Sequence, residues 1–89
     1  MALLDLLGRR WALRVLWELR GKPLGFRELQ SSCDSMSASV LSQRLGELRQ
    51  AGIVELDGDS RYALTEDGAQ LLRALRPIDR WARRWGDRA

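Results

Sequence analysis

Hydrophobic residues recur every three or four positions along most of the chain, which is the spacing of amphipathic helices. In the first segment Leu4, Leu7, Trp11 and Val15 follow this spacing, and Gly8 interrupts the run. A glycine inside such a run weakens a helix because it adds backbone freedom. The pattern therefore predicts a short helix, a break and a second helix.

Residues 25–52 predict two further helices joined by a short turn. Phe26 and Leu29 lie at helical spacing, and a serine-rich stretch follows them. Ser37 stands where a hydroxyl would cap the second helix, and Gly52 is the residue type favoured just past a helix C-terminus. Two helices separated by a turn of this kind form a candidate helix-turn-helix.

Apolar and polar positions alternate in the next segment, which is typical of strands. Val54 and Leu56 precede the sequence Asp-Gly-Asp-Ser at 57–60, and Tyr62 and Leu64 follow it. Two alternating runs on either side of a glycine-containing turn predict a short β-hairpin.

The last segment returns to helical spacing. Thr65 is a candidate cap, the helix should reach about Trp85, and Pro77 is expected to kink it. Apolar residues repeat there at intervals of four, three, four and three residues, the spacing of a helix-pairing seam. A small domain cannot bury so wide a stripe alone, so we expect part of it to meet a second copy of the chain. Alternatively, the stripe packs back on the domain's own core. The expected dimer interface comprises Leu3, Leu4, Leu7, Leu71, Leu75, Ile78, Trp81, Ala82 and Trp85.

The helix predicted within residues 37–52 has an unusual outer face. Leu41, Leu45 and Leu48 cluster within a narrow arc at about 100° per residue, so they form the core stripe. A helix face that only needs to be soluble is usually crowded with Lys and Glu. The side chains on this face are instead short or neutral. Such a face either reads a base edge or is simply solvated. The positions farthest from the leucines are Ser39, Gln43, Gly46 and Gln50.

Length and charge limit the function. The 89 residues suffice for one domain, residues 1–89, with a single modest core. Fifteen Lys and Arg against twelve Asp and Glu give a net charge of +3, which favours an anionic partner. Lys22 is the only lysine. Arginine suits bidentate contacts with phosphate and guanine, although biased codon usage would give the same composition.

Several function classes lack the residues that they require. The chain has one cysteine, Cys33, and no histidine, which excludes an internal disulfide framework and argues against a metal site or imidazole catalysis. No nucleophile with a base, glycine-rich phosphate loop or set of convergent carboxylates is evident, so we expect neither enzymatic activity nor a cofactor. The apolar run near the start is too short for a membrane span or a signal sequence, which predicts a cytoplasmic protein without membrane association.

The aromatic residues and the cysteine have structural explanations. Trp11, Trp17, Trp81 and Trp85 could stack on single-stranded bases, but all four lie in the predicted terminal helices. Core or interface packing is the better interpretation of these side chains. Cys33 lies in the predicted turn beside apolar neighbours, which favours a small buried hydrophobe over a sensor thiol.

With the broken first segment counted as one helix, the predicted order is helix, helix, helix, hairpin, helix, which makes a mainly α winged helix-turn-helix with a small β-hairpin. In this order of elements and in several sequence stretches, the chain resembles the HxlR-type transcriptional regulators, a MarR-like branch of the winged helices. The run Ser-x-x-Val-Leu-Ser-Gln-Arg-Leu-x-x-Leu followed by Gly-Ile-Val is fairly specific, whereas Tyr-x-Leu-Thr-x-x-Gly recurs across many winged helices. The resemblance is carried by LDLLGRRW at 4–11, GFREL at 25–29, SASVLSQRLGELRQAGIVE at 37–55 and YALTEDG at 62–68.

The sequence also departs from this family's pattern. The family commonly has an N-terminal extension with a cysteine, whereas this chain starts almost at the first predicted helix. Gly46 stands where a basic residue is often found, and close approach to DNA or a crowded helix crossing would each explain it. The hairpin is short, and Asp57 and Asp59 at its tip would repel phosphates at close range. Arg61 is the basic candidate there, and a solvated strand residue is the alternative.

The resemblance implies a regulator that binds double-stranded DNA. In a helix-turn-helix the first part of the second helix enters the major groove, and the first helix crosses the DNA backbone. Gln43 can pair with an adenine edge, Arg44 with guanine or a phosphate, and serines with a phosphate or either base. Arg27 is the expected phosphate clamp. The expected DNA contacts are Arg27, Ser37, Ser39, Ser42, Gln43, Arg44 and Arg61.

We therefore expect a homodimer that binds a pseudo-palindromic duplex site. The alternative is a winged-helix module that binds another protein through the Ser/Gln face or the acidic wing. Salt dependence separates the two, because DNA binding through several arginines weakens steeply with added salt and a largely apolar protein contact does not.

Overall fold

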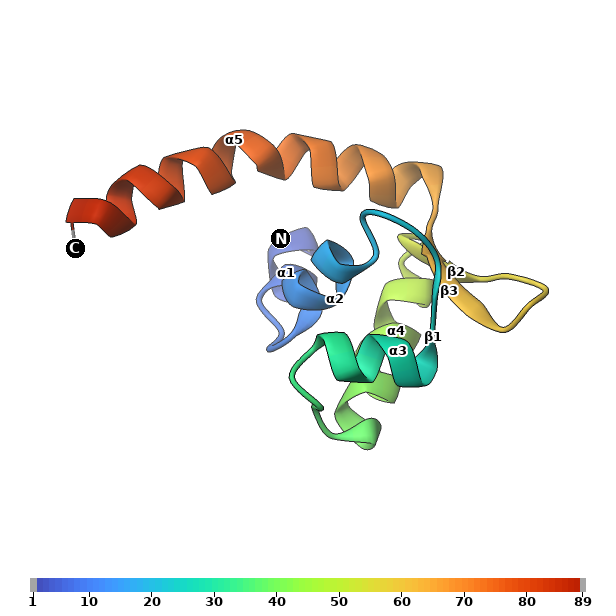
Figure 1. Cartoon of the computed structure of the whole chain (residues 1–89). Coiled ribbons are helices and arrows are strands. Elements are labelled where there is room, and N and C mark those ends of the chain that lie inside the picture. The colour runs from blue at the N-terminus through green and yellow to red at the C-terminus, as the bar shows by residue number, and fades with distance from the viewer. Residues whose placement is uncertain (1, 89) are drawn as a thin grey trace.

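The computed structural model describes residues 2–88, and these form a mostly helical domain with a small antiparallel sheet (Figure 1). The element order matches a winged helix-turn-helix. Within the described residues the elements are α1 (Ala2–Leu7), α2 (Ala12–Glu18), β1 (Leu24–Gly25), α3 (Phe26–Ser32), α4 (Ala38–Gln50), β2 (Val54–Leu56), β3 (Arg61–Leu64) and α5 (Glu66–Arg88).

The break predicted at Gly8 separates α1 from α2. The Gly8 amide donates to the Leu4 carbonyl at 2.8 Å, and a Cβ at Gly8 would lie only 2.9 Å from that same oxygen. Trp11 then adopts a φ of 77°, a left-handed conformation that bulky residues rarely take, directly before α2. The junction between the two helices is therefore a tight turn in which the absence of a side chain at Gly8 has a steric reason.

The predicted helix-turn-helix is confirmed in α3 and α4. Ser37 caps α4, because its Oγ accepts the Val40 amide at 3.5 Å. Gly52 follows α4 with a φ of 77°, the left-handed conformation that a glycine adopts without strain. The turn between the helices contains two further left-handed residues, Asp34 and Ser35.

Arg14 of α2 holds this turn in place. Its NH2 donates to the Ser32 carbonyl at 2.7 Å, and its NH1 contacts Asp34 at 3.3 Å. Its Nε donates to Glu18 at 3.0 Å, and this hydrogen bond is the main reason that the pKa of Arg14 is raised. Arg14 is thus a structural side chain that connects α2 to the helix-turn-helix.

The sheet has three strands in the order β1-β3-β2, all antiparallel. Val54 pairs with Leu64 in the predicted hairpin, and Leu24 of β1 pairs with Tyr62 on the other side of β3. The sequence interpretation missed β1 because two residues are too few to show an alternating pattern. The third strand gives β3 a partner on both sides and joins the wing to the start of α3.

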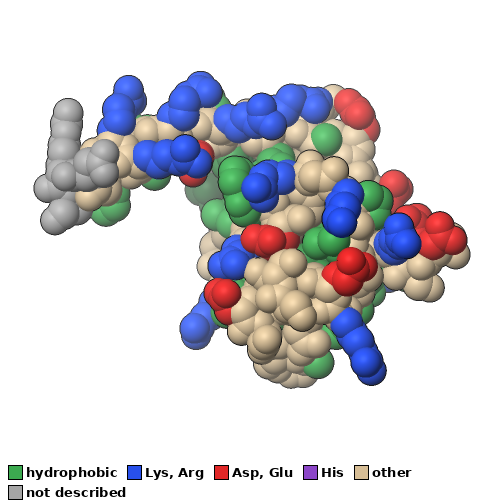
Figure 2. All heavy atoms as spheres, in the orientation of Figure 1, with side chains coloured by type: hydrophobic (Ala, Val, Ile, Leu, Met, Phe, Trp, Pro, Cys, Tyr) green, Lys and Arg blue, Asp and Glu red, His purple; other side chains and the backbone are tan. Residues whose placement is uncertain are grey.

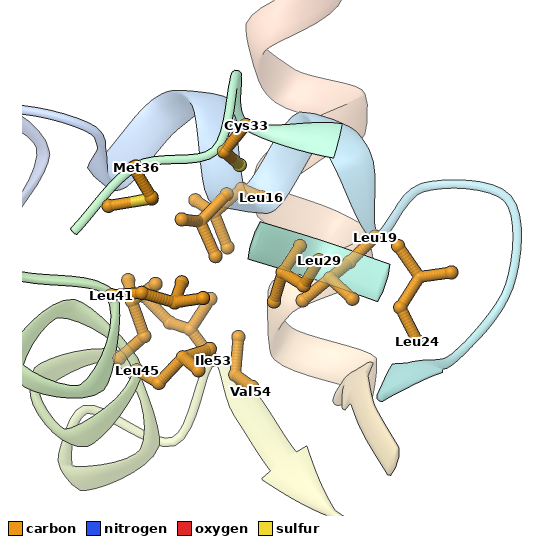
Figure 3. Packing of buried hydrophobic residues seen from close by; sticks show 12 residues of the cluster. Leu16, Leu19, Leu24, Leu29, Cys33, Met36, Leu41, Leu45, Ile53 and Val54 are labelled. Carbon is orange, nitrogen blue, oxygen red and sulfur yellow. The ribbon is translucent and has the colours of Figure 1, made fainter. Parts of the chain in front are cut away.

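The core lies where α2, α3, α4 and the start of β2 meet (Figure 3). Leu16, Leu29, Leu41 and Leu45 are at most 2% exposed, and burial of one such side chain contributes roughly 1.5–3 kcal/mol. The α2 helix packs against α3 and α4 on one side and against α5 on the other. The core therefore fixes α4 through its leucine stripe and leaves the opposite side of that helix free.

The α5 helix begins where the sequence predicted. The Thr65 hydroxyl accepts the Gly68 amide at 3.1 Å and donates to the Gly52 carbonyl. The helix continues through Pro77 to Arg88 as one gently arched ribbon, so proline neither ends it nor introduces a sharp break (Figure 1). Its C-terminal half extends beyond the rest of the domain (Figure 1).

Candidate nucleic-acid interface

The outer face of α4 is a solvent-exposed surface whose centre, in the described chain, consists of neutral residues. Ser39, Ser42, Gln43, Gly46 and Gln50 are all exposed, while the leucines on the other side are buried. A Cβ at Gly46 would meet nothing within 4 Å, which rules out a crowded helix crossing within the described chain as the reason for this glycine. Here amide and hydroxyl groups are free to contact a partner at close range.

The beginning of α4 adds hydrogen-bonding groups to this face. The Ser37 and Ser39 hydroxyls lie 2.9 Å apart, and both residues are exposed. The first amides of a helix have no partner within the helix and carry partial positive charge. The N-terminal end of α4 therefore presents donors next to Gln43, in a suitable arrangement for phosphate and base-edge oxygens.

Arg44 does not lie on this outer face. Its Nε donates to the Arg10 carbonyl at 2.8 Å, and its NH1 donates to Glu47 at 2.7 Å. Its side chain is only 13% exposed. The helical spacing places Arg44 on a flank of the outer face, from which a long side chain can turn either way. In the structure it turns toward the α1–α2 junction, where its Nε is occupied by the Arg10 carbonyl and is not free for a base contact.

Arg27 and Arg61 lie at the edges of the motif. Arg27 is exposed in the first turn of α3, and Arg61 is exposed at the start of β3. Within residues 2–88 neither guanidinium takes part in a side-chain hydrogen bond or an ion pair. Both guanidinium groups are therefore free to contact an anion.

One of the two aspartates at the tip of the wing has a structural role within the hairpin. Asp57 Oδ1 accepts the Asp59 amide at 2.8 Å and the Arg61 amide at 3.0 Å. Asp57 thus closes the hairpin turn, in which Ser60 has a φ of 59°. The wing tip is built by an aspartate and remains acidic, so Arg61 is the only cation in the described hairpin, residues 54–64.

Other arginines near the helix-turn-helix differ in whether their guanidinium groups are free to contact an anion. Arg9 approaches Glu47 at 3.7 Å, and Arg14 is held as described above. Arg10 and Arg49 are exposed, with the Arg10 guanidinium 6.0 Å from the Trp11 ring. Within residues 2–88, Arg10, Arg27, Arg49 and Arg61 have exposed side chains without an ion pair, so these four can meet an anion.

The single cysteine is not accessible. Cys33 is 0% exposed in the core, and burial raises the pKa of its thiol, an effect that nearby Arg14 partly opposes. A buried, protonated thiol is a poor nucleophile. The prediction that Cys33 acts as a small core hydrophobe is consistent with this environment.

The faces predicted for the dimer interface divide into two groups. Leu7, Leu71 and Leu75 are half-buried, and the first two pack against the domain's own core. By contrast, Leu4, Ile78 and Trp85 are 63%, 59% and 58% exposed. The remaining exposed members of the predicted interface are Leu3, Trp81 and Ala82.

The projecting part of α5 is strongly amphipathic. Trp81 stacks on Trp85 with ring centroids 5.9 Å apart and planes at 8°, yet both rings remain largely exposed. Figure 2 shows basic side chains, which in α5 are all arginine, in a row along the other side of the helix, while hydrophobic side chains gather where α5 passes over the domain. The apolar side of α5 is thus only partly covered by its own chain.

Two further properties of residues 2–88 bear on other functions. No cluster of three or more potential metal ligands occurs there. No described helix is both long and apolar enough to cross a bilayer.

The comparisons with known proteins agree on one family. A model of the HxlR-like helix-turn-helix matches residues 6–89. The uncharacterized HTH-type transcriptional regulator YvaP of Bacillus subtilis (strain 168) is 33% identical over 93% of this chain and 82% of its own length. The quinone-bound structure of YodB from B. subtilis has a TM-score of 0.79 and 32% identity, covering 99% of this chain and 93% of that one.

A third relative comes from Thermoplasma volcanium GSS1. The crystal structure of a possible HxlR family transcriptional factor from this organism has a TM-score of 0.81 and 30% identity, and the match covers 97% of this chain and 82% of that one. The family model spans nearly the whole sequence, and the structural neighbours share the winged-helix architecture. The chain therefore belongs to the HxlR-like helix-turn-helix family of DNA-binding transcriptional regulators.

Proposed function

We propose that this regulator binds a pseudo-palindromic duplex site as a homodimer, with one α4 helix of each copy in the major groove. The observation that carries the proposal is the outer face of α4, which is exposed, uncharged at its centre and rich in amide and hydroxyl groups. A major groove admits a helix of this kind and offers donors and acceptors that distinguish the base pairs.

We assign the contacts by chemistry and position. Gln43 pairs with an adenine edge, and Ser39 and Ser42 contact a base or a phosphate. Ser37 and the first amides of α4 meet a phosphate, as anions are favoured at a helix N-terminus. Arg27 clamps the backbone from α3, and Arg61 contacts it at the edge of the wing.

The dimer is proposed from the exposed apolar side chains of the terminal helices. Leu4, Ile78, Trp81 and Trp85 are each more than half exposed, although large apolar side chains are most often buried. Exposed apolar side chains that share one face of a projecting helix are typical of an interface between chains. Two chains paired there would also supply two recognition helices to one duplex.

The quinone of the YodB structure raises the question of a thiol-reactive effector. We propose that Cys33 does not serve as the reactive group in this chain, because its thiol is buried and its pKa is raised. A direct covalent response at this residue would first require the core to open.

A selection of binding sites from random duplex DNA tests the proposed function. We expect enrichment of two inverted half-sites, and we expect affinity for the selected duplex to fall steeply as salt increases. A selection without any enriched site, together with salt-independent capture of a protein partner, would contradict the proposal and favour the interaction module. Titrations at several salt concentrations with a scrambled duplex of equal length supply the control.

A further inference from the structure

Arg44 and Glu47 connect the recognition helix to a distant part of the chain. Arg44 donates from Nε to the Arg10 carbonyl at 2.8 Å and from NH1 to Glu47 Oε1 at 2.7 Å. The second oxygen of Glu47 faces Arg9 Nε at 3.7 Å. Two neighbouring side chains of α4 therefore hold the backbone and a side chain of the α1–α2 junction.

The junction that they hold is short and conformationally restricted. Gly8 donates to Leu4 at 2.8 Å, Ala12 donates to Arg9 at 3.1 Å, and Trp11 has a left-handed φ of 77°. Trp11 is also half-buried against the core. Such a turn transmits the position of one helix to the other, since little freedom remains between α1 and α2.

The α1 helix carries exposed apolar side chains, including Leu3 at 37% and Leu4 at 63%. In the homodimer proposed above, these side chains belong to the interface between copies. The contacts of Arg44 thus lie on a direct route from the recognition helix, through the junction, to the surface that meets the second copy.

We propose that Arg44 is a positioning residue that sets the orientation of α4 relative to the dimer interface, and so determines the spacing between the two half-sites that the dimer accepts. The inference rests on the proposed dimeric DNA-binding function. Successive major grooves are about 34–36 Å apart, and one added base pair rotates a half-site by roughly 35° about the duplex axis. A recognition helix held at a fixed angle discriminates against such a rotation, whereas a loosely held one does not.

The test uses the full chain and a set of duplexes with two inverted half-sites, taken from the site selection, whose spacers differ by single base pairs. Binding is measured by anisotropy for the wild type and for Arg44→Met, which keeps an unbranched side chain but removes every donor. The wild type should bind its best spacer at least about tenfold more tightly than the neighbouring ones, whereas Arg44→Met should reduce this ratio to about twofold. Preference for the half-site sequence over its scrambled version should stay unchanged.

Two matched variants accompany this measurement. Glu47→Ala removes the link to Arg9 and one partner of Arg44, so it should also broaden the range of spacers that the dimer accepts. If circular dichroism shows that Arg44→Met is not folded, Glu47→Ala takes its place. Arg49→Ala removes an exposed cation from the same helix, and within residues 2–88 the Arg49 side chain has no hydrogen bond or ion pair. It should weaken binding to every spacer alike.

The possible outcomes separate the two hypotheses. If Arg44→Met, or its substitute Glu47→Ala, keeps a sharp spacing optimum, the positioning role is wrong. If Arg44→Met instead relaxes the preference for one base while the spacing optimum stays sharp, Arg44 reads DNA directly. If the wild type binds no duplex, or binds all spacers equally, the proposed dimeric DNA-binding function itself fails.

Discussion

Gln43 and its neighbours on α4 owe their proposed role to side chains that are short or neutral and exposed. A charged outer face would attract any duplex, whereas amides and hydroxyls gain most when they meet a matching base edge. The affinity for DNA in general must then come from residues such as Arg27 and Arg61 at the edges. This division of roles makes the individual residues separable by experiment.

Replacement of Gln43 with Ala should lower preference for the selected sequence more than general duplex affinity. A loss of about 1–3 kcal/mol in discrimination is expected if Gln43 makes one bidentate pair with a base. Competition titrations with selected and scrambled duplexes measure the difference. Equal weakening on both duplexes would show that Gln43 does not read sequence.

Arg27→Ala should behave in the opposite way. We expect similar weakening on selected and scrambled duplexes, and a salt dependence that is shallower by about one unit of slope, because one phosphate contact is lost. Affinities at four or more salt concentrations give this slope. A relaxed sequence preference with an unchanged salt slope would be inconsistent with a phosphate clamp.

Cys33 should react slowly with an aromatic disulfide reagent in the native protein and rapidly in denaturant. Its burial and raised pKa both disfavour the thiolate, which is the reactive form. The pKa of the Cys33 thiol is higher in the folded state than in the unfolded state. Its contribution to the free energy of unfolding is therefore fully present below the ordinary thiol pKa of about 8.5, and it is lost as pH rises through the higher pKa of the folded state. Native reaction as fast as that of free cysteine would refute the buried environment.

Helical spacing located the outer face of α4 but not the direction of the Arg44 side chain on its flank. The arc of Leu41, Leu45 and Leu48 determines which residues face away from the core, so Ser39 and Gln43 could be identified from spacing alone. Arg44 could not, because its direction depends on a carbonyl and a carboxylate that the fold brings next to it. Tertiary contacts decide where a long side chain on a helix flank points.

At the scale of elements, the ends of the helices were the most predictable features. Ser37, Gly52 and Thr65 have the residue types that caps require, and each acts where the sequence indicated. The Pro77 kink is not evident, because the helix continues through that position. The strand β1 has only two residues, and its pairing with β3 depends on the folded chain.

Gly68 provides a test of how α5 is joined to the sheet. Gly68 is buried, and a Cβ there would lie 2.1 Å from the Ile53 carbonyl oxygen. Gly68→Ala should therefore reduce the free energy of unfolding by about 1–3 kcal/mol, because the start of α5 must move away from the Ile53 backbone to make room for the methyl group. Urea denaturation followed by circular dichroism measures it.

Gly46→Ala is the matched control for that substitution. Gly46 is also a helical glycine, but a Cβ added there would meet no described atom within 4 Å, so alanine should stabilise the fold by up to about 1 kcal/mol. Opposite signs for the two substitutions are expected. A neutral or stabilising Gly68→Ala would mean that α5 can shift away from Ile53 without cost.

For the whole molecule, the proposed affinity for duplex DNA depends on joining two recognition helices that each bind weakly alone. One recognition helix with neutral side chains, beside an acidic wing tip, has few contacts to offer a duplex. Two such helices in a dimer make the second contact intramolecular, which raises apparent affinity by about 10²–10⁴ without any new type of contact. The projecting α5 helix is the feature that favours this pairing, because its exposed apolar residues lie far from α4.

Dimerisation through the terminal helices is tested by measuring mass by sedimentation and duplex affinity by anisotropy on the same samples. The wild type is compared with the double variant Ile78→Glu, Trp85→Glu, whose side chains are exposed and outside the core. We predict a dimeric wild type and a folded monomeric variant that binds the two-half-site duplex at least about 100-fold more weakly. A variant that remains dimeric, or a folded monomer that binds the same duplex as tightly as the wild type, would show that pairing of the terminal helices is not what makes DNA binding tight.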